Sequence, residues 1–117
     1  MFQEMQPMSI GGGTKGYYQD TLTVNASTYT YINDGKSIGF KPKYIYYRNS
    51  HTSPTYNFIH VCYNKDVSST NVVQYYGNST YSGTTVSEIL DITSDGKVGI
   101  KKVNDWGTTV YDIFCIS

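Results

Sequence analysis

The histidines and cysteines are the side chains best able to hold a metal, and the chain has two of each. His60 and Cys62 would share one face of a strand, about 7 Å apart along it. A zinc site needs further ligands in a tetrahedral arrangement, and neither His51 nor Cys115 is adjacent in sequence. We therefore expect no metal site, and we interpret both histidines as packed or surface residues.

The glycine-rich residues 11–16 read Gly-Gly-Gly-Thr-Lys-Gly and formally match the dinucleotide-binding pattern G-x-G-x-x-G. Phosphate binding requires a preceding strand and a following helix, whose N-terminus meets the phosphates. Here the following segment is strand-like, and Gly16 precedes Tyr17 rather than the lysine of a Walker A motif. The sequence predicts a hinge at these glycines and no bound cofactor.

The acidic residues show no arrangement typical of catalysis or calcium binding. Residues 91–96 faintly resemble a calcium loop, but Lys102 stands where that loop needs a bidentate glutamate. There is no Gly-x-Ser-x-Gly elbow, and spacing singles out no carboxylate pair of the kind a glycosidase uses. We therefore expect that the protein is not an enzyme.

Cys62 and Cys115 lie in two apolar strand-like runs, 57–63 and 110–116. They could form a disulfide between neighbouring strands, or they could be two thiols that pack as small hydrophobic residues. Residues 1–5 have neither the basic nor the apolar region of a signal peptide, so none is expected. Two cysteines without a signal peptide favour free thiols.

The chain has 117 residues and a formal net charge of zero. This length predicts a single folded domain. Zero net charge argues against a general nucleic-acid binder, which needs excess positive charge to displace counterions, and against a polybasic membrane-surface protein. No apolar run approaches the roughly 20 residues of a membrane-spanning helix, so no membrane insertion is expected.

The composition predicts strands rather than helices. Thr, Tyr, Ile and Val make up 46 of the 117 residues, against one Ala and two Leu. Side chains that are β-branched or aromatic suit a pleated, half-buried surface. We predict an all-β protein, an antiparallel β-sandwich of the jelly-roll or immunoglobulin-like type. The expected strands are 17–25, 27–33, 37–48, 55–64, 70–76, 86–93, 97–103 and 108–116.

One hairpin can be predicted in register. If residues 94–96 form a three-residue loop, Gly96 closes it in the left-handed region with a G1 bulge. The resulting pairs are Ile92 with Val98, Leu90 with Ile100, and Glu88 with Lys102.

Two strands are apolar on both faces, where a strand with one face in water should alternate. The residues facing one way are Tyr56, Phe58, His60 and Cys62, and those facing the other are Ile59, Val61 and Tyr63. In the last strand, Phe114 and Ile116 likewise oppose Ile113 and Cys115. Either another subunit covers the outer face, or the tyrosines simply tolerate exposure.

Residues 1–16 are predicted to be a flexible N-terminal arm, and residues 17–117 the β-sandwich domain. The arm contains all three methionines, Pro7 and three consecutive glycines. A run of glycines has high backbone entropy and resists regular structure.

Residues 37–48 read Ser-Ile-Gly-Phe-Lys-Pro-Lys-Tyr-Ile-Tyr-Tyr-Arg. This segment resembles the Gly-Phe-Lys-Pro-Lys strand of small β-sandwich domains in tailed-bacteriophage fibre and tail proteins. The hairpin at 90–103 and the final strand at 108–117 also resemble that family. Pro42 restricts Lys41 to an extended conformation and removes a ladder donor, so it should lie on an edge strand or where a strand begins.

The resemblance implies a structural protein of the phage virion, assembled in the bacterial host cytoplasm and commonly a homotrimer. One role is host-receptor binding to a surface glycan or protein, and the expected patch is Tyr75, Tyr76, Tyr81 and Trp106. Trp106 could instead be buried, as most tryptophans are. The other role is capsid or tail decoration, with docking to other virion proteins through Met1, Phe2, Met5, Met8 and Ile10. The alternative function is a stand-alone carbohydrate-binding module.

Overall fold

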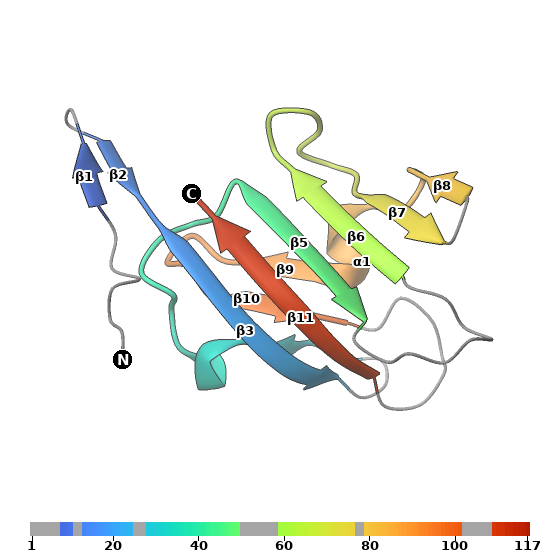
Figure 1. Cartoon of the computed structure of the whole chain (residues 1–117), viewed down its shortest axis with the longest axis horizontal. Helices are drawn as coiled ribbons and strands as arrows, with labels where there is room; N and C mark the ends of the chain where they lie inside the picture. Colours follow the sequence, from blue (N-terminus) through green and yellow to red (C-terminus); the bar gives the residue numbers. More distant parts are fainter. Residues whose placement is uncertain (1–7, 11–12, 25–27, 50–58, 77–78, 102–108) are drawn as a thin grey trace.

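The computed structural model describes residues 8–10, 13–24, 28–49, 59–76, 79–101 and 109–117 (Figure 1). Its largest sheet has six antiparallel strands in the order β3-β11-β5-β6-β7-β8. The strands of this sheet are β3 Tyr17–Val24, β11 Thr109–Ile116, β5 Tyr44–Asn49, β6 Ile59–Asn64, β7 Val73–Tyr76 and β8 Ser79–Tyr81. A second sheet has the order β4-β10-β9, with bounds Thr30–Tyr31, Val98–Ile100 and Leu90–Ile92.

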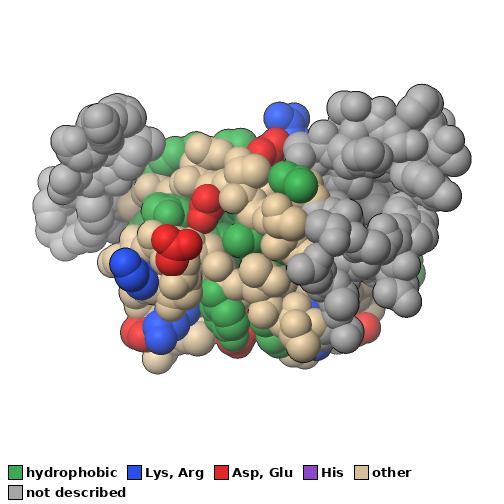
Figure 2. Space-filling model, turned by 90° about the horizontal axis from the view of Figure 1, so that it is seen from below, with side chains coloured by type: hydrophobic (Ala, Val, Ile, Leu, Met, Phe, Trp, Pro, Cys, Tyr) green, Lys and Arg blue, Asp and Glu red, His purple; other side chains and the backbone are tan. Residues whose placement is uncertain are grey.

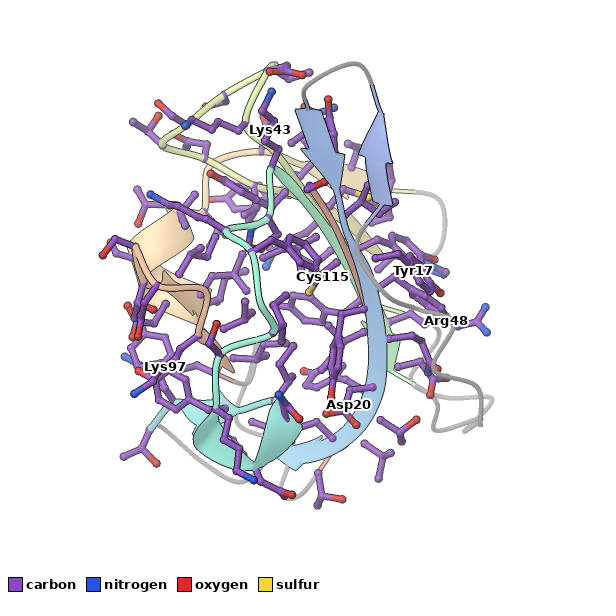
Figure 3. The ribbon with its side chains drawn as sticks, turned by 90° about the vertical axis from the view of Figure 1, so that its left-hand side faces the viewer. Tyr17, Asp20, Lys43, Arg48, Lys97 and Cys115 are labelled. Carbon is purple, nitrogen blue, oxygen red and sulfur yellow. The ribbon has the colours of Figure 1, made fainter. Side chains whose placement is uncertain are left out.

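The two sheets pack together around one apolar core. Along β11 the side chains of Ile113 and Cys115 are fully buried, whereas Phe114 is half-buried and Ile116 is exposed. The core side chains are Val24, Ile45, Tyr47, Val61, Tyr63, Tyr111, Ile113 and Cys115 from the six-stranded sheet, and Leu90, Val98 and Ile100 from the other. Figure 3 shows the layers edge-on, with Cys115 between them and Arg48 outside. The predicted all-β sandwich is confirmed.

The β9–β10 hairpin confirms two of the three predicted pairs, because Ile92 pairs with Val98 and Leu90 with Ile100. Gly96 has a φ of +90°, as the predicted loop requires. The third pair was wrong, since Glu88 lies in the one-turn helix α1, Val86–Ile89.

A capping interaction explains why this segment is helical. The Glu88 carboxylate accepts hydrogen bonds from the backbone N–H and the hydroxyl of Thr85, both at 2.8 Å. These bonds lower the pKa of Glu88. Thr-x-x-Glu is a capping-box signature of a helix N-terminus, and it outweighs the strand preference of the surrounding residues.

The strand predicted at 37–48 begins only at Tyr44. Gly39 has a φ of +92°, which breaks extended structure, and Pro42 is buried just before the strand. The backbone N–H of Lys43 already bonds to the carbonyl of Ile116 at 3.0 Å. Pro42 therefore lies where a strand begins, as predicted, and β5 itself is an inner strand between β11 and β6.

Within the described residues, the strands predicted at 70–76 and 86–93 exist but are shorter, as β7 and β9. The strand predicted at 27–33 is reduced to β4, because Asn33 and Asp34 take positive φ values in a 3-10 turn, η2 (Asn33–Gly35).

Among the described residues, no helix is long and apolar enough to cross a membrane.

Part of the predicted arm forms an antiparallel hairpin of β1 (Met8–Ile10) and β2 (Gly13–Lys15). Figure 1 shows this hairpin beyond the N-terminal end of β3, away from the two packed sheets. Ile10 pairs with Gly13. Met1, Phe2 and Met5 lie outside the described residues, and docking through this region stays a prediction.

The cysteines cannot form a disulfide, because they lie on opposite faces of one sheet. Strand β5 separates β6 from β11. Cys62 pairs with Tyr46, and Cys115 pairs with the next residue of β5, Ile45. Both cysteines are free, so the interpretation as packed thiols is confirmed.

Candidate functional site

The outer face of the six-stranded sheet carries an aromatic row beside a polar row. Register places Phe114, Tyr46, Cys62 and Val73 side by side in one row. The ring of Tyr46 lies 6.1 Å from Phe114, centroid to centroid. These half-buried side chains account for the second apolar face expected from the sequence.

The polar row runs parallel to it, through Asp112, Arg48, His60 and Tyr75. Arg48 Nε lies 3.9 Å from a carboxylate oxygen of Asp112, and the Tyr46 hydroxyl is hydrogen-bonded to Nδ1 of His60. His60 is therefore a packed surface residue, as predicted. In the part of the chain that the structure describes, no three His, Cys, Asp or Glu side chains cluster as metal ligands.

At the β6–β7 end of this face lies a groove of about 490 Å³. Its lining comes from β6, β7, the connecting loop 65–72 and Ser82. The apolar part consists of Cys62, Val67, Val72, Val73 and Tyr75, and the polar part of Asn64, Ser68, Asn71 and Ser82. A concave, mainly apolar site with a few polar groups is the usual form of a ligand site.

Loop 65–72, which forms one wall of the groove, is braced at both ends. At its start, the backbone N–H of Lys65 donates to the carbonyl of Lys43 at 2.9 Å. The Tyr44 hydroxyl donates to the Asp66 carboxylate at 2.5 Å. At its end, the Val72 N–H donates to the carbonyl of Thr84 at 3.0 Å. A loop held this way presents its side chains in fixed positions.

The tip of this loop carries an exposed apolar side chain. Val67 is 76% exposed, the highest value among the exposed large hydrophobic residues of the described chain. Its N–H bonds to the carbonyl of Asn64 at 3.0 Å, which fixes its backbone without burying its side chain. Val67 is therefore available to pack against a ligand.

The residues of the predicted receptor patch do not lie together on one face of the structure. Tyr75 is 40% exposed and lines the groove. Tyr81 is 54% exposed, but it pairs with the buried Gln74 and so faces the opposite side of the sheet. Tyr76 follows Tyr75 in β7 and pairs with Ile59 and Ser79. Trp106 lies outside the described residues.

The remaining groove residues were not predicted from the sequence. A signal was present in residues 64–71, Asn-Lys-Asp-Val-Ser-Ser-Thr-Asn, where one apolar residue stands among polar turn formers. An apolar residue in such a turn has no core to enter, which makes it a candidate contact residue.

A second hollow of about 540 Å³ lies where the two sheets meet near α1. Its apolar walls include Tyr63 and Leu90, which are nearly fully buried core residues. The Asp91 carboxylate on its rim already accepts a hydrogen bond from the Tyr31 hydroxyl. The outer groove is the stronger candidate because Tyr75 and Val67 are accessible there.

The two thiols should differ in reactivity towards iodoacetamide. Burial raises the pKa of Cys115 to about 12, and burial also raises that of the half-buried Cys62. The thiolate is the reactive form, so we expect native protein at mildly alkaline pH to be alkylated at Cys62 first, and the unfolded chain at both. Equal native rates, read by peptide mass spectrometry, would contradict the burial of Cys115.

Basic and acidic side chains are interspersed on the face of the molecule seen in Figure 2.

No protein-family model, no curated protein and no solved structure matches the chain.

Proposed function

We propose that the chain is a non-enzymatic surface protein of a bacteriophage virion that recognises the host surface through the groove beside loop 65–72. The observation that carries the proposal is Tyr75, an exposed aromatic residue in a groove with a braced wall. Exposed aromatic and apolar residues on a rigid scaffold are typical of recognition surfaces. The resemblance of residues 37–48 to phage fibre and tail domains supports the virion context.

The same resemblance supports a homotrimer. We assign the subunit contact to the β3–β11–β5 part of the outer face, where Phe114 is half-buried and Ile116 is 45% exposed. The groove lies at the other end of this sheet, over β6 and β7. Subunit contact and ligand binding would thus use separate parts of one face. Light scattering would then give three times the chain mass of 13.2 kDa.

Decoration of the capsid or tail is a second candidate, and the β1–β2 hairpin favours it. The hairpin projects beyond the sandwich (Figure 1), and its strands include Met8 and Ile10 of the proposed docking residues. Decoration and receptor binding are compatible, since the hairpin and the groove are built from different segments.

Particle association and cell binding test the proposed function. We expect the chain to be present in phage particles purified by density gradient, at a fixed copy number. We also expect purified chain to bind host cells saturably, with Tyr75→Ala weakening this binding at least tenfold. Tyr81→Ala, the same change on the opposite face of the sheet, should leave cell binding unchanged.

Two outcomes would count against this function. Chain found only in the soluble fraction would favour the stand-alone carbohydrate-binding module. Equal cell binding by Tyr75→Ala and the parent would move recognition away from the groove.

A further inference from the structure

We propose that the groove binds a neutral saccharide, as an internal stretch of a polysaccharide, with Tyr75 packed against a sugar ring. The proposal rests on the recognition site named above and specifies the chemical class of its ligand. The charge, the hydrogen-bonding groups and the shape of the groove support it.

The groove lining carries no charge. None of its nine residues is Asp, Glu, Lys, Arg or His. The loop residue Asp66 is not part of the lining, and its carboxylate already accepts a hydrogen bond from the Tyr44 hydroxyl. A charged ligand would lose water here without gaining a counter-charge, which is unfavourable. The lining therefore favours a neutral ligand over an acidic polysaccharide.

The polar groups of the lining suit hydroxyl groups. The Asn64 side-chain oxygen accepts a hydrogen bond from the Asp66 N–H at 3.0 Å. Its Nδ2 group makes no hydrogen bond to another described residue, so it can donate to a ligand. The Asn71 Nδ2 group donates to the carbonyl of Ser82 at 3.1 Å. With respect to the described residues, its second N–H and the Ser82 hydroxyl are available to a ligand. Amide donors and a hydroxyl can bond to sugar hydroxyls, which both donate and accept.

The apolar groups of the lining suit the C–H face of a sugar ring. Tyr75 provides an exposed ring, and Cys62 and Val73 lie beside it on the neighbouring positions of β6 and β7. Tyrosine combines a large apolar surface with a polar tip. Val67, at the tip of the braced loop, can contact the ligand from the other wall.

The shape of the groove favours a polymer over a small enclosed ligand. Its volume of about 490 Å³ falls within the range of small-molecule sites. The groove opens onto the outer face of the sheet, because it is lined by outward-facing residues such as Cys62 and Tyr75. Because the groove is open on this side, its ligand does not have to be enclosed, and one sugar unit within a longer chain can occupy it.

A glycan array tests the ligand class directly. The probes are neutral polysaccharides (mannan, galactomannan, mixed-linkage β-glucan and dextran) and acidic ones (hyaluronan, polygalacturonate and heparin). We expect retention on at least one neutral glycan, with little change on raising the salt concentration. Retention on acidic glycans alone, or on none of the probes, would overturn the proposal.

Three variants locate the binding on the array. Tyr75→Ala should weaken retention at least tenfold, whereas Tyr75→Phe, which keeps the ring, should retain most of it. Tyr81→Ala is the matched control and should bind as the parent does. Similar loss in Tyr81→Ala and Tyr75→Ala, with both proteins folded by circular dichroism, would refute the placement in the groove.

Alkylation of Cys62 gives a second readout that does not depend on a variant. Cys62 lines the groove, so a saturating neutral glycan should slow its reaction with iodoacetamide several-fold. An unchanged rate with glycan bound would place the glycan elsewhere.

The experiments separate this inference from the proposed function. If no neutral glycan binds, while Tyr75→Ala still weakens binding to host cells, the groove is a recognition site but its ligand is not a neutral saccharide. If a neutral glycan binds in the groove but phage particles lack the chain, the proposed ligand is correct and the proposed role in the virion is wrong.

Discussion

Replacing Gly96 with alanine is expected to lower the free energy of unfolding by about 3–5 kcal/mol, combining a left-handed conformation with a steric clash. Gly96 closes the β9–β10 hairpin with a φ of +90°. An added Cβ would lie 2.6 Å from the carbonyl oxygen of Phe40 and 2.8 Å from the Ser37 hydroxyl. Ser37 and Phe40 cannot easily move away from the added Cβ. The Ile38 N–H, which lies between them in the sequence, donates to the carbonyl of Gly96 at 2.8 Å and holds the segment against the hairpin.

Gly39→Ala is the matched control for this substitution. Gly39 has nearly the same φ, +92°, but an added Cβ would have no atom within 4 Å. Gly39→Ala should therefore lower the free energy of unfolding through backbone strain alone, by about 1–2 kcal/mol. Urea denaturation of the two variants measures the difference. Equal destabilisation would mean that the packing of the 37–40 segment against the hairpin is not as the structure has it.

Replacing Ile113 with alanine is expected to cost about 3–4 kcal/mol of unfolding free energy, through lost burial and the cavity left behind. Ile113 is fully buried in β11, where it lies between Asp20 of β3 and Tyr47 of β5. Ile113 belongs to the core that side chains of both sheets form, so truncating it to alanine is expected to leave a cavity.

Ile116→Ala provides the control on the same strand. Ile116 is 45% exposed, so the same change should cost less than about 1 kcal/mol in an isolated chain. Chemical denaturation at a concentration where the chain is monomeric compares the two. An Ile113→Ala variant no less stable than Ile116→Ala would contradict the assignment of inner and outer faces.

Much of the sandwich could be predicted because short-range patterns decide it. The alternation placed Ile113 and Cys115 on one face of β11 and Phe114 and Ile116 on the other, as the structure has them, although it did not show which face is buried. The loop closed by Gly96 fixed the β9–β10 register, since only one loop length pairs Leu90 with Ile100. Composition alone was enough for the all-β class.

The errors arose where a local interaction overrides strand preference. The bond between Thr85 and Glu88 turns one predicted strand end into α1. Gly39 and Pro42 keep 37–43 out of the sheet, although the apolar pattern runs through it. Both signals were present in the sequence, but neither shows in a count of apolar periodicity.

The groove could be predicted only in part, because it depends on contacts between distant segments. The sequence singled out Tyr75 as an exposed aromatic residue. Its separation from Tyr81 follows from the β7–β8 register, and the loop wall follows from bonds to Lys43 and Thr84, which are far from it in sequence. Pairings of this kind cannot be read from local spacing.

Backbone NMR on the uniformly 15N-labelled chain would show whether the groove is the recognition site. The neutral glycan that the chain retains on the array, cut to soluble oligosaccharides, would be titrated into the full chain. We predict amide shift changes concentrated in the groove-lining residues of the segment 62–75 and at Ser82. The amides of residues 90–92, beside the inter-sheet hollow, should be unaffected. Changes centred on Tyr81 or Asp91, with none in the groove, would show that the glycan is bound elsewhere on the protein.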